Sequence, residues 1–205
     1  LGLDRTQHFI PGIDEGSYLR VDNTQIPDSI RSTEILYVGA CYLNSWGFKK
    51  AMLMSKFTGF DLSIYGNNAW KRWFDFFPEL RPAYHETGYL DTKQVNLMFN
   101  KTKIVPVDGN PAILNGVHLR LMEALGSGAL PLIEYRSDVD QLIFSGSGID
   151  LPLIRNYNQA IDLAQYWLGH DKERIQTVEA MRSFVLRQYS AEMNAGRLSS
   201  RLNKG

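Results

Sequence analysis

Short apolar runs alternate with segments of helical spacing along most of this chain. The runs cover residues 34–40, 61–65, 103–107 and 130–134, with shorter ones at 84–87 and 149–154. Continuous runs of this length are typical of strands buried on both faces of a parallel sheet. Helices are expected over residues 46–56, 69–77, 91–100, 116–125, 158–168, 171–189 and 190–202. The alternation predicts an α/β fold, a Rossmann-like parallel sheet with helices on both faces.

The chain divides into three stretches. Residues 1–33 are rich in proline, glycine, aspartate and asparagine, with turn signals at Pro11-Gly12 and Pro27-Asp28, and they predict a connecting strap. Residues 34–189 hold the alternating pattern and form the predicted main domain, and residues 190–205 form a terminal helical segment. Residue 1 is not Met and no basic-then-apolar leader follows it, so we expect a part of a longer protein.

The bulk composition argues against several classes of function. The 205 residues include 22 Lys and Arg against 22 Asp and Glu, whereas a nucleic-acid-binding domain usually carries a basic excess. Cys41 is the single cysteine, so no internal disulfide forms and we expect a cytoplasmic location. No apolar run is long enough to span a bilayer, and the histidines lack the spacing of metal ligands. We therefore expect no nucleic-acid partner, no metal site and no transmembrane segment.

The segment at residues 107–133 is the most informative for chemistry. A predicted strand ends in the loop of residues 108–111, and Asn115 and Gly116 open the following helix. Ligands of parallel α/β sheets bind where strand ends feed helix starts. The backbone N–H groups at this helix start are expected to point at a diphosphate, with His118 contributing its N–H rather than its ring. These groups belong to Gly116, Val117, His118 and Leu119.

Two charged residues of the same predicted helix extend this candidate site. Glu123 lies about two turns from the helix start, where its carboxylate can accept hydrogen bonds from two ribose hydroxyls. Arg120 precedes it by three residues on nearly the same helix face and can pair with the phosphate. From spacing alone, Arg120 and Glu123 also fit an ordinary surface ion pair, and the spacing does not decide between the two interpretations.

The run from Asn115 to Pro131 resembles the signature helix of group 1 glycosyltransferases, in which two Glu residues are separated by seven positions and followed by Ala, Gly and Pro. It is most similar to the spore-maturation-protein-like branch, where an Arg precedes the second Glu. The resemblance implies that Glu123 holds the ribose of a nucleotide sugar and that Arg120 is a catalytic residue. The first Glu, which contacts the donor sugar in the family, falls on Asn115 and is a departure from the pattern.

Weaker matches follow in the same order along nearly the whole chain and imply the C-terminal half of a GT-B glycosyltransferase. Gly39 corresponds to the glycine turn after the first strand, where it lets a diphosphate approach or acts as a plain turn glycine. Tyr89 corresponds to the loop that reads the nucleobase, where it stacks on the base or lies half-buried in the core. Lys49 and Lys50 begin the first helix, where they reach a phosphate or at least one of them lies on a solvated face.

The resemblance implies transfer of a sugar from a nucleotide-diphosphate donor, such as a UDP- or GDP-sugar, to an unknown acceptor. This chain is expected to be the donor-binding half, with a missing N-terminal domain supplying the remaining catalytic groups. No cofactor is expected, because helix N–H groups and cations neutralise the leaving diphosphate. The alternative is a non-catalytic nucleotide-binding or docking module with a degenerate site, which Asn115 favours. The glycine motifs of dinucleotide oxidoreductases and nucleotide triphosphatases are missing, which argues against both classes.

Overall fold

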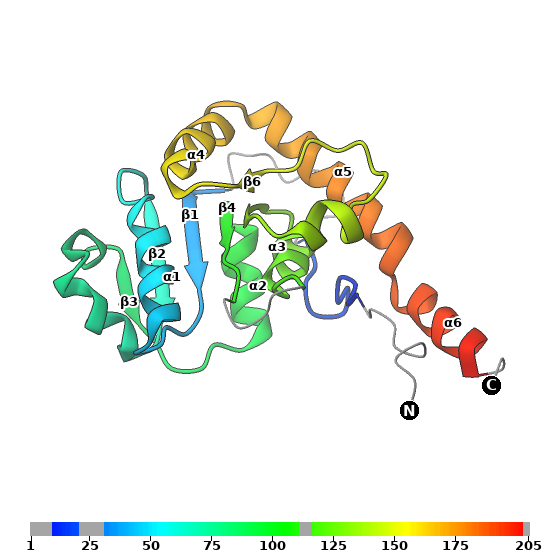
Figure 1. Ribbon diagram of the computed structural model, residues 1–205, viewed down its shortest axis with the longest axis horizontal. Helices are drawn as coiled ribbons and strands as arrows, with labels where there is room; N and C mark the ends of the chain where they lie inside the picture. Colours follow the sequence, from blue (N-terminus) through cyan, green and yellow to red (C-terminus); the bar gives the residue numbers. More distant parts are fainter. Residues whose placement is uncertain (1–9, 21–30, 111–115, 203–205) are drawn as a thin grey trace.

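The computed structural model describes residues 10–20, 31–110 and 116–202, which form a six-stranded sheet surrounded by helices (Figure 1). The strands follow the order β3-β2-β1-β4-β5-β6, and neighbouring strands are parallel throughout. The predicted α/β fold with a parallel sheet is thereby confirmed. The strands are β1 (Thr33–Val38), β2 (Leu62–Gly66), β3 (Tyr84–Glu86), β4 (Thr102–Val107), β5 (Leu130–Glu134) and β6 (Leu153–Ile154).

The helical elements lie between and after these strands, mostly within two residues of their predicted bounds. Three elements are 3-10 helices: η3 (Asn68–Asp75), η4 (Pro78–Leu80) and η6 (Tyr157–Gln159). The element η5 (Val139–Ile143) is a π-helix. The α-helices are α1 (Ser45–Ser55), α2 (Thr92–Asn100), α3 (Arg120–Ser127), α4 (Ala160–Gly169), α5 (Asp171–Tyr189) and α6 (Ala191–Leu202). Asp91 caps α2 as predicted, in a capping box with Gln94.

Helices cover both faces of the sheet, because successive side chains of a strand point to opposite sides. On one face, Leu36 of β1 packs in a small core cluster with Phe99 of α2 and Ala124 of α3. On the other face, Ile35 and its neighbours join the main core with residues of α1, α4 and α5. The α5–α6 arm runs along one side of the molecule and α6 projects away from the sheet (Figure 1).

The strand order reverses between β1 and β4, which lie side by side at the centre of the sheet. The loops after these two strands lead away from each other, to β2 on one side and to β5 on the other. In open parallel sheets, ligands bind in the crevice at the carboxyl ends of the strands at such a switch point. A ligand is therefore expected to bind at the loops after Val38 and Val107.

The start of α3 differs from the prediction. The helix begins at Arg120 instead of Gly116, and residues 116–118 precede it in irregular conformation, with a turn at Leu119. Its first amide is bound locally, because the N–H of Arg120 donates to Nδ1 of His118 at 3.1 Å. At the other end, Gly128 closes the helix in the left-handed conformation with φ 77°. Gly126, which lies just beyond the predicted helix end at residue 125, is part of the helix.

The described part of the predicted strap packs closely on the domain. Ile13 is only 7% exposed and belongs to the main core, so this stretch is more than a connection. Gly12 lies against α5: a Cβ there would come within 1.8 Å of the carbonyl oxygen of Tyr189. Buried Arg31 donates to the carbonyls of Phe99 and Ser127, which satisfies the C-terminal ends of α2 and α3.

Candidate nucleotide site at the carboxyl edge of the sheet

Asp108 is the centre of a buried ionic cluster directly after β4. Its Oδ1 accepts hydrogen bonds from Arg120 Nη1 at 2.7 Å and from the Tyr37 hydroxyl at 2.8 Å. Its Oδ2 accepts one from Trp46 Nε1 at 3.3 Å and faces Lys50 Nζ at 3.6 Å. Burial alone would raise the pKa of this carboxyl, but the charges of Arg120 and then Lys50 hold it well below its usual value. We call these five residues the Asp108 cluster.

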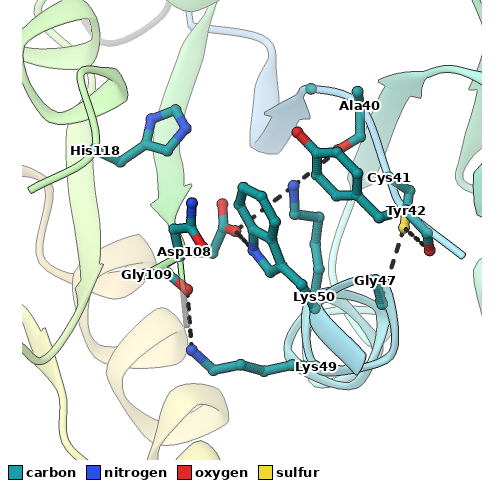
Figure 2. Close-up of polar contacts among 12 residues, drawn as sticks. Ala40, Cys41, Tyr42, Gly47, Lys49, Lys50, Asp108, Gly109 and His118 are labelled. Atoms are coloured by element: carbon teal, nitrogen blue, oxygen red, sulfur yellow. Dashed lines mark hydrogen bonds and ion pairs between the residues drawn. The ribbon is translucent and has the colours of Figure 1, made fainter. Parts of the chain in front are cut away.

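The Lys50 ammonium is buried within the cluster and surrounded by rings and oxygen atoms. Its Nζ lies 5.4 Å from the ring centroid of Tyr37 and 4.9 Å from that of Trp46, and it donates to the carbonyl of Ala40 at 2.8 Å (Figure 2). Burial lowers the pKa of Lys50, and attraction to Asp108 opposes this shift. The ring faces, the carbonyl and the carboxylate replace the water that the ammonium has lost.

The Arg120 guanidinium lies beneath the loop that follows β1. It stacks over the ring of Tyr37 with 4.3 Å to the centroid, and its Nη2 donates to the carbonyl of Val38 at 3.0 Å. Gly39 leaves the room for it, since a Cβ at that position would come within 2.6 Å of Nη2. The surface-pair interpretation of Arg120 and Glu123 is wrong, because Arg120 is 5% exposed and its ion-pair partner is Asp108.

The loop after β1 is fastened by side chains from three different elements. Besides Arg120 of α3 at Val38, Trp70 of η3 donates its Nε1 to the carbonyl of Gly39 at 3.0 Å, and Lys50 of α1 binds Ala40. Further along, Asn67 accepts from the N–H of Cys41 at 2.9 Å, and Trp73 donates to the carbonyl of Tyr42 at 2.8 Å. Side chains from elsewhere in the fold therefore bind the backbone at each position from Val38 to Tyr42.

A second polar network lies next to the Asp108 cluster, around Glu134 at the end of β5. Lys49 places its Nζ 2.5 Å from Glu134 Oε1. The same Nζ donates to the carbonyl of Gly109 at 3.1 Å (Figure 2). The N–H of Gly109 donates to Glu134 Oε2 at 2.8 Å, and the Tyr157 hydroxyl donates to Oε1 at 3.1 Å. The solvated-face interpretation is wrong for Lys49 as it is for Lys50, since Lys49 is only 25% exposed and is ion-paired.

A cavity of about 480 Å³ opens at the carboxyl ends of β1, β2 and β3. Its volume lies within the range of small-molecule sites. Gly39, Tyr65 and the loop of residues 87–90 line it. Within that loop, Tyr89 is 91% exposed, so the interpretation of Tyr89 as a half-buried core residue is wrong. Its ring is free to contact a ligand in this cavity.

Glu123 is half-buried and points towards the N-terminal strap. Its carboxylate accepts a hydrogen bond from the phenol of Tyr18. Burial raises the pKa of Glu123, whereas the charge of Arg120 and the hydrogen bond from Tyr18 act against the rise. Burial and the nearby Glu123 carboxylate raise the pKa of the Tyr18 phenol, and the neighbouring Tyr89 phenol contributes to the same rise. The strap, α3 and the loop after β3 thus bring Tyr18, Glu123 and Tyr89 into one neighbourhood.

Gly116, His118 and Leu119 lie at a different cavity of about 200 Å³, which they share with Ile10 and Pro11 of the strap. The His118 ring is held by the N–H of Arg120, and burial followed by the charge of Arg120 lowers its pKa to about 4. Since Nδ1 is the acceptor, the neutral ring carries its proton on Nε2. Asn115 lies outside the described residues.

The sequence interpretation missed several members of this site. Asp108 and Glu134 were not assigned roles, although each stands at the carboxyl end of a buried strand, where polar side chains converge. Lys50 was treated together with Lys49 as a helix-face residue, and its apolar-aromatic surroundings carried no signal in the linear sequence. Tyr18 lies in the predicted strap, which offered no periodic pattern to single it out.

Comparison with known proteins identifies the family. A model of the family described as glycosyl transferase-like matches residues 48–200 of this chain. The chain belongs to the glycosyl transferase-like family. The match includes most of α1 with its two lysines, the loop after β4 and the whole of α3. The comparison with curated proteins finds no match.

Solved structures of glycosyltransferases share this fold at low sequence identity. The C-terminal domain of the group 1 glycosyl transferase family protein LpcC of Francisella tularensis superimposes with a TM-score of 0.60 at 14% identity, covering 88% of this chain and 100% of that chain. HepE of Anabaena, solved with UDP and glucose, gives 0.67 at 8% identity over 95% of this chain and 56% of that chain.

Sucrose-phosphate synthase of Thermosynechococcus elongatus gives a TM-score of 0.66 at 12% identity over 95% of this chain and 51% of that chain. The glycosyl transferase-like chain thus spans about half the length of HepE and of this synthase. These similarities confirm the predicted Rossmann-like fold, which the chain shares with the C-terminal domain of LpcC.

Residues 10–20, 31–110 and 116–202 contain neither a metal-binding cluster nor a membrane-spanning helix. No three or more His, Cys, Asp or Glu side chains gather there in a way that could hold a metal ion. No helix in the same ranges combines the length and the apolar character needed to cross a membrane.

Proposed function

We propose that this chain is the donor-binding half of a glycosyltransferase that moves a sugar from a nucleotide-diphosphate sugar to an acceptor. One arrangement carries the proposal: the cavity lined by Gly39 and exposed Tyr89 opens beside a loop that the buried cations Arg120 and Lys50 bind, and half-buried Glu123 follows Arg120 by one turn of α3. Each of the three suits one part of a nucleoside diphosphate, and the family is the one in which such donors are used.

The base and the ribose are assigned to the open side of this edge. The nucleobase enters the cavity at residues 87–90, where the ring of Tyr89 stacks on it. The ribose hydroxyls donate to Glu123, since a carboxylate accepts several hydrogen bonds. HepE, which shares the fold, was solved with UDP and glucose, which supports a nucleotide-sugar donor for this chain.

The diphosphate is assigned to the loop after β1 and to the turn at Gly116, His118 and Leu119. Arg120 and Lys50 act on it from beneath Gly39 and Ala40, with Asp108 neutralising only one of the two positive charges. Fixed charges in a water-poor site stabilise a leaving diphosphate without reorganising during the reaction. The catalytic role of Arg120 in this proposal is therefore electrostatic. Lys49 also binds the diphosphate, which replaces Glu134 as its ion-pair partner.

The remaining parts of the reaction lie beyond this chain. A further N-terminal domain is proposed to bring the acceptor and most catalytic groups, in keeping with the share of HepE that this chain spans. We propose that the donor site needs no cofactor. Arg120 with Met122-Glu123-Ala124 supports membership of the spore-maturation-protein-like branch, and the single cysteine supports a cytoplasmic location.

Calorimetric titration of the chain with UDP, GDP and ADP tests the proposal. One of them is expected to bind, and Glu123→Ala is expected to weaken that binding about 10- to 100-fold, the loss of a charge-assisted hydrogen bond. Glu192→Ala, an exposed acid on α6, is the control and should bind as the unaltered chain does. No binding by any of the three, or equal binding by Glu123→Ala, would contradict the proposal. Binding by a longer protein that never transfers sugar would point to a non-catalytic module.

A further inference from the structure

Tyr18 of the strap has a fixed place beside α3. Its N–H closes a turn by donating to the carbonyl of Asp14 at 2.8 Å, and the same turn is supported by the Asp14 carboxylate, which accepts from Gly16 at 3.1 Å. Gly126 lets the strap approach the helix, since a Cβ there would come within 2.8 Å of the Cβ of Tyr18. The ring packs on the core cluster that contains Leu36.

This placement brings the Tyr18 hydroxyl to Glu123, one helical turn before Gly126. The phenol hydroxyl donates a hydrogen bond to the carboxylate, and both side chains are half-buried. A phenol that lies in a core cluster and reaches a half-buried carboxylate removes rotational freedom from that carboxylate. No other residue of the strap contacts Glu123 in this way among the interactions described for residues 10–20.

We propose that Tyr18 is a positioning residue for the ribose: its hydroxyl holds one oxygen of the Glu123 carboxylate, so that the other oxygen faces the nucleotide. The inference rests on the proposed function, because it assigns a partner to the carboxylate that grips the pentose. It also extends the donor site from the sheet edge to the strap, a segment that the glycosyl transferase-like match at residues 48–200 does not include.

The pairing has a consequence for the choice of ligand. A carboxylate oxygen held in one direction is left without a partner when the ribose lacks the hydroxyl that should meet it. Sites built to bind a hydroxyl strongly reject analogues that lack it, because a buried polar group then stays unpaired. The chain is therefore expected to prefer a ribonucleoside diphosphate over its 2′-deoxy or 3′-deoxy analogue, and Tyr18 is expected to sharpen that preference.

The test compares Tyr18→Phe with the unaltered chain, using the nucleoside diphosphate that binds best among UDP, GDP and ADP, together with its deoxy analogues. Tyr18→Phe should weaken binding of the ribonucleotide about 3- to 10-fold, which is the effect of one hydrogen bond. It should also reduce the ratio of the affinities for the ribonucleotide and its deoxy analogues. In a Glu123→Gln background the same change should have little further effect, because the partner of the hydroxyl has already been altered.

A pH profile separates positioning from general packing. Arg120 on α3, Asp14 on the strap and Tyr89 of the loop after β3 are the charged or titratable groups that face the pair. Burial already raises the pKa of Glu123, and loss of the Tyr18 donor removes one of the interactions that hold it down. Nucleotide binding by Tyr18→Phe should therefore fail at a higher pH on acidification, and the Glu123 carboxyl should titrate higher by NMR without nucleotide.

Tyr189→Phe is the matched control, because its hydroxyl donates to the carbonyl of Ile143 at 2.9 Å, in a hydrogen bond that involves neither the strap nor Glu123. It should leave both the affinity and the pH profile unchanged. Nucleotide binding with unaltered affinity and pH profile in Tyr18→Phe overturns the role of Tyr18 while the proposed function stands. Absence of binding by the unaltered chain overturns the proposed function and the ribose role together.

Discussion

The loops after β1 and after β3 line the same cavity but are built in opposite ways. In the loop after β1, the carbonyls of Val38, Gly39 and Ala40 are each bound by a side chain from another element. In the loop after β3, Tyr89 is 91% exposed, and a Cβ added to Gly88 would have no neighbour within 4 Å. The loop after β1 is therefore held by side chains of α1, η3 and α3, whereas the loop after β3 is exposed to solvent.

This difference separates the two tasks of a nucleotide site. The fixed loop faces the place assigned to the diphosphate, where charge must be stabilised by groups that do not move. The open loop faces the place assigned to the base, where a flat ring can be met by stacking without tight surroundings. Changes to the first loop should thus alter stability and binding together, and changes to the second should alter binding alone.

Asp108→Asn should produce the largest effect, because it leaves Arg120 and Lys50 buried without a carboxylate. Breaking such a pair costs about 3–5 kcal/mol of unfolding free energy. Denaturant unfolding at pH 7 measures this, with Asp75→Asn as the control, since its pair with Arg81 at 3.7 Å is exposed and worth about 0–1 kcal/mol. Equal losses in the two variants would show that the Asp108 cluster does not stabilise the fold.

The pH dependence of this loss follows from the depressed pKa of Asp108. The carboxylate contributes its stability above its ordinary pKa of about 4 and loses it as the pH falls further towards the folded-state pKa. The difference between the unaltered chain and Asp108→Asn should therefore shrink below about pH 4. A difference that stays constant on acidification would contradict the ionised state of Asp108.

Gly39→Ala against Gly88→Ala compares the two loops directly. The new methyl at residue 39 meets Arg120 Nη2 at 2.6 Å, and that guanidinium is bound to Asp108 and Val38, so strain of about 1–3 kcal/mol is expected. At residue 88 the methyl meets nothing, and the change should stay within about 0.5 kcal/mol. Thermal or denaturant unfolding of both variants measures this difference, and equal losses would contradict the tight packing of Gly39 against Arg120.

Tyr89→Ala should separate binding from folding. Its ring is exposed, so the free energy of unfolding should change by less than about 0.5 kcal/mol. Loss of stacking on a base costs about 1–3 kcal/mol, which corresponds to roughly 5- to 150-fold weaker nucleotide binding. Leu198→Ala, another exposed apolar residue, serves as the control on α6. Unchanged nucleotide affinity in Tyr89→Ala would contradict the assignment of the nucleobase to the loop of residues 87–90.

His118→Asn gives the smallest expected effect and sharpens the description of the helix start. The pKa of His118 is lowered to about 4 from 6.5, so protonation favours the unfolded chain, and stability is lost as the pH falls below about 6.5. The amide oxygen of Asn can take the place of Nδ1 and does not titrate. The variant should retain about 1 kcal/mol more stability at pH 5 relative to pH 7, allowing for the partial exposure of the ring. Parallel losses in both proteins would contradict the buried neutral imidazole.

The fold was predictable because its signals are local. Strand β5 and helix α5 have their predicted bounds, and α2 begins where Asp91 caps it. The main error concerned α3, whose start moved to Arg120 because the His118 ring binds the first amide. A contact between a side chain and a backbone amide two residues later depends on a turn conformation that helical periodicity does not encode.

The sequence by itself determined the order of strands and helices and the edge of the sheet at which the candidate site lies. Apolar periodicity, glycine turns and caps act over a few residues, and they suffice for that level. Only the tertiary structure decided which charges meet. Tyr37 and Asp108 are 71 positions apart and Val38 and Arg120 are 82 apart, yet they touch across adjacent strands and α3. Such pairings follow from how the elements pack in three dimensions, and burial then fixes their strength.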